Sequence, residues 1–297
     1  MQDWQKLWNT QGDKILKNIL AIGTAANNIV QQLSQYPVYQ CYYISNEIEK
    51  TSKFKFALPL KETPEDYESL DMKKMHSWLN KITKSCTIMI NGASESSAIT
   101  LRALEHLHKK KVKMNIVYFM PEIEVLSENK ILLERSVRGI LQNFARSGLF
   151  EGISLVSNVM LEKLAGPTNV IDYYDQINHV FTSTYYMLDV FKNTKPTTST
   201  FKKPKESCRI STIGISSTEE EENLFFPFQD EVEVIYYYGI NEERLKTEEN
   251  LFRKITDKIK SKITEERKVS FGIYPTQYEN DYIYVEMFSP KIQQEEK

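Results

Sequence analysis

Short apolar runs alternate along the first half of the chain with stretches whose apolar residues recur every three or four positions. The runs predict strands, and the recurring positions predict helices, such as the face formed by Ile29, Val30 and Leu33. Strands that alternate with helices predict a mostly parallel, Rossmann-like sheet with helices on both faces. The predicted strands are 14–23, 38–45, 54–58, 85–91, 114–120 and 152–158.

Helix signals between these strands are local. Thr63 followed by Pro64 predicts a helix beginning, since Thr caps and Pro suits the first turn, and this helix is expected to continue through Leu79. Further helices are predicted from about 95 to 110, around 131–145, and from about 170 to 191. The last is long enough to serve as a central helix.

The composition changes after that helix. Thr, Pro and Lys dominate residues 192–207, which predicts an exposed connection. Four apolar runs and one helix (245–263) follow, which predicts a smaller α+β domain. We therefore predict an N-terminal extension (1–13), a nucleotide-binding-like α/β domain that includes the long helix (14–192) and a linker (193–207). A smaller α+β domain (208–290) and a tail (291–297) follow.

Composition narrows the choice of partners. The chain has 297 residues, 41% of them hydrophobic, and a formal net charge of −2, so it has no global attraction for nucleic acid or anionic membrane, although local binding is not excluded. We expect no nucleic-acid partner.

The sequence lacks an apolar run of about 18 residues and a signal pattern, so we expect no membrane span and a cytoplasmic location. Cys41, Cys86 and Cys208 lie far apart, which favours buried thiols over disulfides or a zinc site.

The segment NGASESSAIT (91–100) joins a predicted strand to a predicted helix, a junction at which many α/β proteins hold phosphate. Glycine makes up 10 of 297 residues, against a usual share of about 7%, so a glycine-rich phosphate cradle is not available. Gly92 is the only glycine here, and Ser94 can offer a hydroxyl. A nucleotide site, a remnant of one, and a plain connection all remain open.

Several segments in a fixed order resemble the tubulin and FtsZ superfamily of filament-forming GTPases. LVSNVMLEKL (155–164) resembles the strand-to-loop segment whose asparagine contacts guanine, and YYDQINHVF (173–181) resembles the start of the central helix. RISTIGISS, YYYGI and KVSFGIY resemble the second domain. The resemblance covers roughly residues 14–290.

This resemblance implies a guanine-nucleotide site and head-to-tail self-association into filaments, with contacts to other proteins also open. GTP or GDP, with nucleotide-associated Mg²⁺ as the only metal, would contact the first loop, the strand-to-helix loop and the base-binding positions. An alternative interpretation makes Tyr174 a core aromatic and the asparagines capping or turn residues. The implied contact residues are Gly23, Asn28, Gly92, Ser94, Asn158, Tyr174 and Asn178.

The chain departs from the family at both loops that matter for hydrolysis. Where relatives carry GGGTGTG, this chain keeps Gly92 alone and adds Glu95, whose charge opposes phosphate. The family's catalytic acids fall in a segment that corresponds here to KPTTSTFKKPK (195–205), which holds lysines and no acid. Lysine does not accept a proton from water at neutral pH unless strongly desolvated, so no catalytic residue is assigned and slow or absent hydrolysis is expected.

Other motifs are weaker. His106 and His108 face different directions on a helix, so a shared metal is not expected, and His76 and His179 are interpreted as packing or surface residues. The KKKVK run (109–113) is interpreted as a helix end, with a nucleic-acid patch as the alternative. The acidic tract 218–223 is expected to be solvated surface. Two hypotheses remain. The first is a filament-forming protein with a degenerate guanine-nucleotide site, and the second is a non-catalytic scaffold. A small-molecule enzyme is a weaker third alternative, because the sequence lacks a dinucleotide-binding fingerprint.

Overall fold

The computed structural model describes residues 16–94, 96–216 and 222–294. The described residues form two compact units, one within residues 16–182 and one within residues 183–294, called here the N-terminal and C-terminal units. The boundary falls inside α8 (Tyr173–Lys192), the predicted long helix. The predicted extension (1–13), Glu95, and parts of the acidic tract and tail lie outside the described residues.

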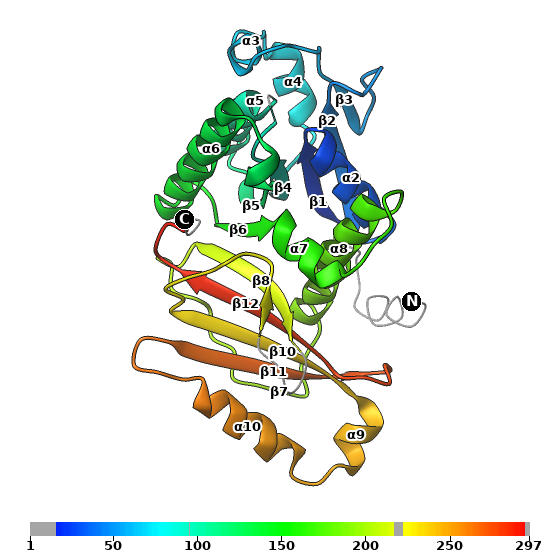
Figure 1. The fold of residues 1–297 in the computed structure, drawn as a ribbon, viewed down its shortest axis with the longest axis vertical. Helices are drawn as coiled ribbons and strands as arrows, with labels where there is room; N and C mark the ends of the chain where they lie inside the picture. The colour runs from blue at the N-terminus through cyan, green and yellow to red at the C-terminus, as the bar shows by residue number, and fades with distance from the viewer. Residues whose placement is uncertain (1–15, 95, 217–221, 295–297) are drawn as a thin grey trace. The chain divides into compact units, whose positions relative to one another are not determined.

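Six parallel strands form the sheet of the N-terminal unit, in the order β3-β2-β1-β4-β5-β6 (Figure 1). Ile19 and Leu20 of β1 are fully buried and lie beside β4, with Leu20 opposite Ile88. Central strands apolar on both faces are what a sheet covered by helices on both sides requires. The strands are β1 (Lys17–Ile22), β2 (Tyr39–Ser45), β3 (Lys55–Ala57), β4 (Ser85–Asn91), β5 (Lys113–Met120) and β6 (Gly152–Ser157).

Helices cover both faces, with α2 and α8 on one side and α4, α5 and α6 on the other (Figure 1). The single helix predicted from Thr63 is in fact two. The Thr63 hydroxyl accepts the Asp66 N–H at 3.2 Å and begins α3, and the Asp71 carboxylate accepts the Lys73 N–H at 3.0 Å where α4 begins. The elements are α2 (Thr24–Leu33), α3 (Pro64–Glu68), α4 (Lys73–Leu79), α5 (Ser97–Lys109), η1 (Ile123–Val125), α6 (Glu128–Arg146) and α7 (Asn158–Ala165).

The strands of the C-terminal unit lie in the order β8-β12-β10-β11-β7, with β9 paired to β8. β10 and β11 are parallel and the other pairs are antiparallel. The predicted helix 245–263 is two helices, because Asn250 adopts a left-handed backbone (φ 64°) between them. The elements are β7 (Thr198–Ser199), β8 (Ile210–Ser216), β9 (Asn223–Leu224), β10 (Glu233–Asn241), α9 (Glu242–Thr247), α10 (Leu251–Ser261), β11 (Lys268–Thr276) and β12 (Tyr282–Ser289).

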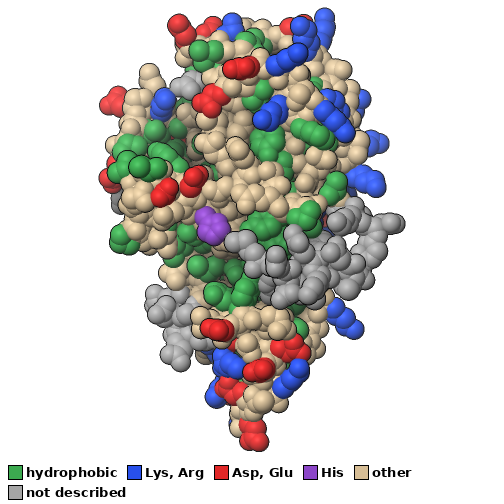
Figure 2. Space-filling model, turned by 90° about the vertical axis from the view of Figure 1, so that its right-hand side faces the viewer, with side chains coloured by type: hydrophobic (Ala, Val, Ile, Leu, Met, Phe, Trp, Pro, Cys, Tyr) green, Lys and Arg blue, Asp and Glu red, His purple; other side chains and the backbone are tan. Residues whose placement is uncertain are grey.

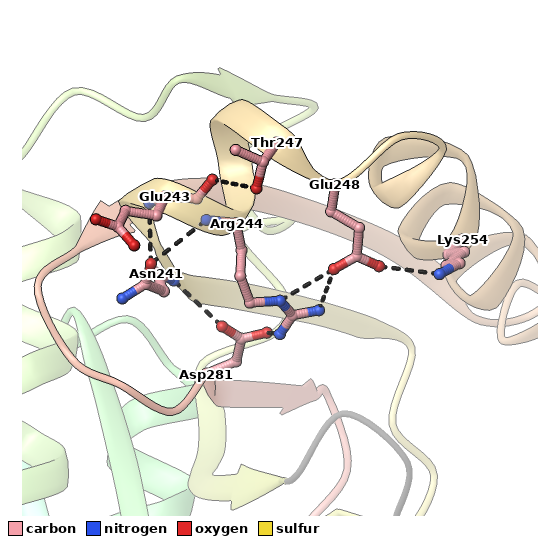
Figure 3. Close-up of polar contacts among 7 residues, drawn as sticks. All are labelled: Asn241, Glu243, Arg244, Thr247, Glu248, Lys254 and Asp281. Atoms are coloured by element: carbon pink, nitrogen blue, oxygen red, sulfur yellow. Dashed lines mark hydrogen bonds and ion pairs between the residues drawn. The ribbon is translucent and has the colours of Figure 1, made fainter.

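A polar cluster fixes the short helix α9 to the sheet of this unit (Figure 3). The Asn241 side chain accepts two backbone N–H groups of the first turn, as a helix cap does. Arg244 bonds Glu248 at 2.6 Å and also pairs with Asp281, which directly precedes β12, while Lys254 of α10 reaches Glu248 at 2.9 Å. These contacts tie both helices to the ends of β10 and β12.

Candidate nucleotide site

A cavity of about 300 Å³ lies at the carboxyl edge of the parallel sheet. Chain segments leave β1 and β4 there in opposite directions, because β2 lies on one side of β1 and β4 on the other. Ligands of open α/β sheets bind at this kind of switch point. The lining residues are Gly23, Thr24, Ala25, Asn46, Glu47, Tyr67, Asn91, Ala93, Ser94, Ser96 and Lys130.

Gly23 forms the turn between β1 and α2. Its φ of 92° strongly favours glycine, and a Cβ there would lie 3.2 Å from the Ser96 Oγ and 3.3 Å from the Ser94 Oγ. Gly23 is the N-cap residue of α2, and no side-chain cap bonds to the first turn of this helix among the described residues. The first-turn N–H groups of α2 lie beside the cavity, an arrangement that suits an anion.

The loop between β4 and α5 supplies the opposite wall. Ser94 and Ser96 join their hydroxyls at 2.7 Å, and the Ala93 N–H donates to the Asn91 side chain at 3.3 Å. Among the described residues at the start of α5, the N-cap residue Ser96 makes no side-chain cap hydrogen bond. Two helix amino ends and two serine hydroxyls thus face the cavity, whereas Glu95, predicted to oppose phosphate, lies outside the described residues.

Gly92 does not line the cavity, and its neighbour gives it a packing role. A Cβ on Gly92 would lie 1.7 Å from the Tyr118 hydroxyl oxygen. That hydroxyl donates to the Glu134 carboxylate at 3.1 Å, and Glu134, fully buried, pairs with Arg138 at 2.7 Å. The pKa of Tyr118 is raised well above its usual value, mainly because the hydroxyl is buried and secondly because the Glu134 carboxylate is negatively charged.

Two side chains of opposite charge line the cavity. Lys130 lies in the first turn of α6, and Glu47 follows β2. The ammonium group can bind phosphate oxygens, while the carboxylate repels them unless a Mg²⁺ ion lies between. Sequence reasoning missed both, because each belongs to a segment distant from the two loops with which it lines the cavity.

The predicted base-binding residues do not line this cavity. Asn158 is the first residue of α7 and is half-buried, and Tyr174 on α8 is 70% exposed. Asn178 is buried, although it lies one turn from Tyr174. Gln32 of α2 explains the difference, since it bonds the Asp175 carbonyl at 3.0 Å and the Thr182 hydroxyl at 3.1 Å on the same face as Asn178.

The asparagine predicted to serve the first loop, Asn28, is exposed on α2 and does not line the cavity. Its neighbour Asn27 instead has a buried side-chain oxygen that lacks a hydrogen-bond partner among the described residues. The cavity therefore brings together Gly23 and Ser94 of the predicted set. Gly92 is adjacent to it, and the other four predicted residues lie on α2, α7 and α8.

A histidine pair lies elsewhere in the N-terminal unit. His76 of α4 stacks on His106 of α5 with ring centroids 4.3 Å apart and planes at 4°, and the His106 Nε2 lies 3.0 Å from the Asn80 side-chain oxygen. Burial is the main cause that lowers the pKa of both rings. In the described part of the chain, no cluster of three or more metal-ligating side chains occurs. Nor is any helix there long and apolar enough to cross a membrane.

The segment expected from the resemblance to correspond to the family's catalytic loop, residues 195–205, belongs to the C-terminal unit. Part of it forms β7, and the Thr197 and Thr200 N–H groups donate to β11 carbonyls at 2.8 Å. Lys202, Lys203 and Lys205 are exposed. The three cysteines are buried free thiols, as predicted.

Solved structures of TubZ, FtsZ and CetZ share this fold. A GTPγS-form protofilament of TubZ from Bacillus thuringiensis serovar israelensis matches with a TM-score of 0.72 at 11% identity, over 93% of this chain and 88% of that one. An FtsZ dimer from M. jannaschii matches with a TM-score of 0.67 at 12% identity, over 97% and 92%.

A GTPγS-bound protofilament of CetZ2 from Haloferax volcanii matches with a TM-score of 0.66 at 11% identity, over 92% of each chain. No protein-family model matches the chain, and no characterised protein matches its sequence. The predicted tubulin/FtsZ-like fold is therefore confirmed by structure alone.

Proposed function

We propose that this chain is a tubulin/FtsZ-like cytoskeletal protein that binds GTP or GDP weakly and self-associates head to tail in the cytoplasm. The observation that supports it most is the cavity at the switch point of a sheet with this fold. Two uncapped helix amino ends, the Ser94 and Ser96 hydroxyls and Lys130 can together bind phosphate oxygens.

The site is degenerate in this proposal, for two reasons. Among the described residues that line the cavity, Gly23 is the only glycine, so Cβ atoms limit the approach of backbone N–H groups to phosphate. Residues 195–205 hold no carboxylate that could polarise water, and their lysines are poor proton acceptors. We therefore expect hydrolysis to be slow or absent.

Self-association has separate support. Val170 and Ile171 of the α7–α8 connection are 94% and 92% exposed, and Tyr174 in the first turn of α8 is 70% exposed, so three large apolar side chains close in sequence are exposed. Exposed apolar clusters of this kind commonly mark protein contacts. Head-to-tail growth needs two unlike faces that do not close into a ring, and the TubZ and CetZ2 structures are described as protofilaments.

A non-catalytic scaffold is the second candidate, and Gly92 favours it. The one glycine of the strand-to-helix loop is explained by Tyr118, without any need for a phosphate. Glu47 adds a negative charge to the same cavity. Both features are expected where a fold is retained and its nucleotide is lost.

Equilibrium binding of fluorescent GTP and GDP distinguishes the two candidates. We expect measurable binding of both nucleotides in the presence of Mg²⁺, weakened about tenfold by Lys130→Ala, because one charge-assisted contact is lost. Lys163→Ala removes an exposed lysine of α7 and serves as the matched control, with affinity unchanged. Absence of binding by the unaltered chain would leave the scaffold as the better account.

A further inference from the structure

Lysines from two separate segments, α4–β4 and α5–β5, converge on the amino edge of the parallel sheet, opposite the edge that holds the cavity. The Lys113 N–H donates to the Lys84 carbonyl at 2.9 Å, so the starts of β4 and β5 lie side by side. The helices α4 and α5 end at the same edge, because each runs back before its following strand begins. We call this set the lysine edge: Lys81, Lys84, Lys109, Lys110, Lys111 and Lys113.

Most of these charges are uncompensated. Lys109 pairs with Glu105 at 2.5 Å, and Lys81 donates to the Lys53 carbonyl and lies over the Trp78 ring. The other four are exposed, and none has a carboxylate within ion-pair distance among the described residues. These four are Lys84, Lys110, Lys111 and Lys113.

Two of the four occupy backbone conformations that favour glycine. Lys84 and Lys111 have φ values of 63° and 59°. Lys111 follows the end of α5, where its N–H donates to the His108 carbonyl and the Val112 N–H donates to the Leu107 carbonyl, the arrangement in which glycine is usual. The fold would accept glycine at both places more readily, so lysine keeps a positive charge there against backbone strain.

The surroundings of the lysines suit phosphate. Exposed side chains between them are polar, namely Thr83, Ser85, His108 and Asn115, and can add hydrogen bonds to phosphate oxygens. None of them is an apolar side chain that could insert into a bilayer. Figure 2 shows Lys and Arg side chains gathered along the right-hand margin of the upper part of that view, so positive charge is unevenly distributed over the face drawn there. Adjacent strands are about 4.8 Å apart, so lysines that begin neighbouring strands can meet successive phosphates.

We propose that the lysine edge binds the phosphate backbone of double-stranded nucleic acid without sequence preference. Sequence analysis expected no such partner, because it relied on net charge and took the 109–113 run as a helix end. Helix dipoles explain lysines at the ends of α4 and α5. They do not explain Lys84, which directly precedes β4, or Lys113, which begins β5. The proposal is independent of whether the cavity binds nucleotide.

Fluorescence anisotropy of the full chain with a labelled DNA duplex of arbitrary sequence tests this, at salt concentrations from about 50 to 300 mM. We expect binding whose affinity falls steeply with salt. Lys84→Gly with Lys111→Gly removes two charges and relieves the backbone strain, so the variant should fold at least as well. Its affinity at low salt should fall about tenfold, and its log–log salt slope should decrease by about two.

Two further variants separate charge position from total charge. Lys84→Arg with Lys111→Arg keeps the charges and should retain the affinity. Lys73→Gln with Lys74→Gln removes two exposed lysines of α4 and should also retain it. The proposal is overturned if the unaltered chain does not bind duplex at low salt, or if the glycine and glutamine variants lose affinity equally. Binding to phosphatidylserine vesicles without binding to duplex would overturn it as well, in favour of a membrane surface.

Discussion

The hydroxyl of Tyr118 lies where a side chain on Gly92 would have to be, since a Cβ on Gly92 would fall 1.7 Å from that oxygen. Gly92 is the only glycine in the loop that resembles a phosphate-binding loop. Tyr118 of β5 packs so closely against Gly92 that glycine is required there, whether or not a phosphate binds to the loop. A glycine in this loop is therefore weak support for a bound phosphate.

Gly92→Ala should lower the free energy of unfolding by about 2 to 4 kcal/mol, because an overpacked core must shift Tyr118 and its bond to Glu134. Gly139→Ala in α6 is the matched control, as nothing lies within 4 Å of its added Cβ. The control should be stabilised by about 0.5 to 1 kcal/mol. Urea unfolding measures both. A folded, equally stable Gly92→Ala chain that has lost nucleotide would contradict the packing role.

Arg138→Met should be strongly destabilising, since it leaves the fully buried Glu134 carboxylate without its cation. Breaking such a pair lowers stability by about 3 to 5 kcal/mol, whereas replacing both partners by apolar residues is often nearly neutral. We therefore expect Glu134→Leu with Arg138→Met to unfold at a higher urea concentration than Arg138→Met alone. Additive losses in the double-mutant cycle would show that the pair is not coupled.

Acid should destabilise the N-terminal unit through the stacked histidines. Burial lowers the pKa of His76 and His106 below the ordinary 6.5, so the unfolded chain binds more protons than the folded one as pH falls. Their contribution to stability is present above pH 6.5 and is lost as pH drops through 6.5 toward the folded pKa. Replacing both by Phe keeps the stacking and should flatten the decline in melting temperature between pH 7 and 5. If the melting temperature of this variant falls with pH as steeply as that of the unaltered chain, other titratable groups cause the acid destabilisation.

Local chemistry made much of the fold predictable. Strands such as β1 and β4 are continuous apolar runs, and Ile29, Val30 and Leu33 of α2 are all buried, as their spacing predicts. Breaks within helices were missed, because Asn250 in a left-handed conformation is a property of the folded turn and not of helix periodicity.

The candidate site was harder to predict, since its contacts join distant segments. Lys130 and Gly23 line the same cavity, and His76 stacks on His106, although nothing in the local pattern links either pair. Tyr174 and Asn178 share a helical spacing that predicts one face, but the packing of α2 buries only the second. Sequence spacing gives the direction of a side chain and does not give its surroundings.

The exposed apolar residues of the α7–α8 connection should contribute to assembly. Val170→Ser with Ile171→Ser changes side chains that are more than nine-tenths exposed, so stability should change by less than about 0.5 kcal/mol. Self-association should weaken, because apolar area is lost from the contact. Analytical ultracentrifugation of the variant beside the unaltered chain measures this. If the variant self-associates as strongly as the unaltered chain, Val170 and Ile171 do not contribute to the contact between subunits.

High-speed sedimentation of the purified chain with GTP, with GDP and without nucleotide tests the central claim most directly, with the pellets examined by negative-stain microscopy. The account predicts filaments with GTP and few or none in the other two samples, because a degenerate cavity that still binds phosphate can still favour assembly. Equal filaments in all three samples, or none in any, would contradict it and favour a scaffold without a nucleotide switch.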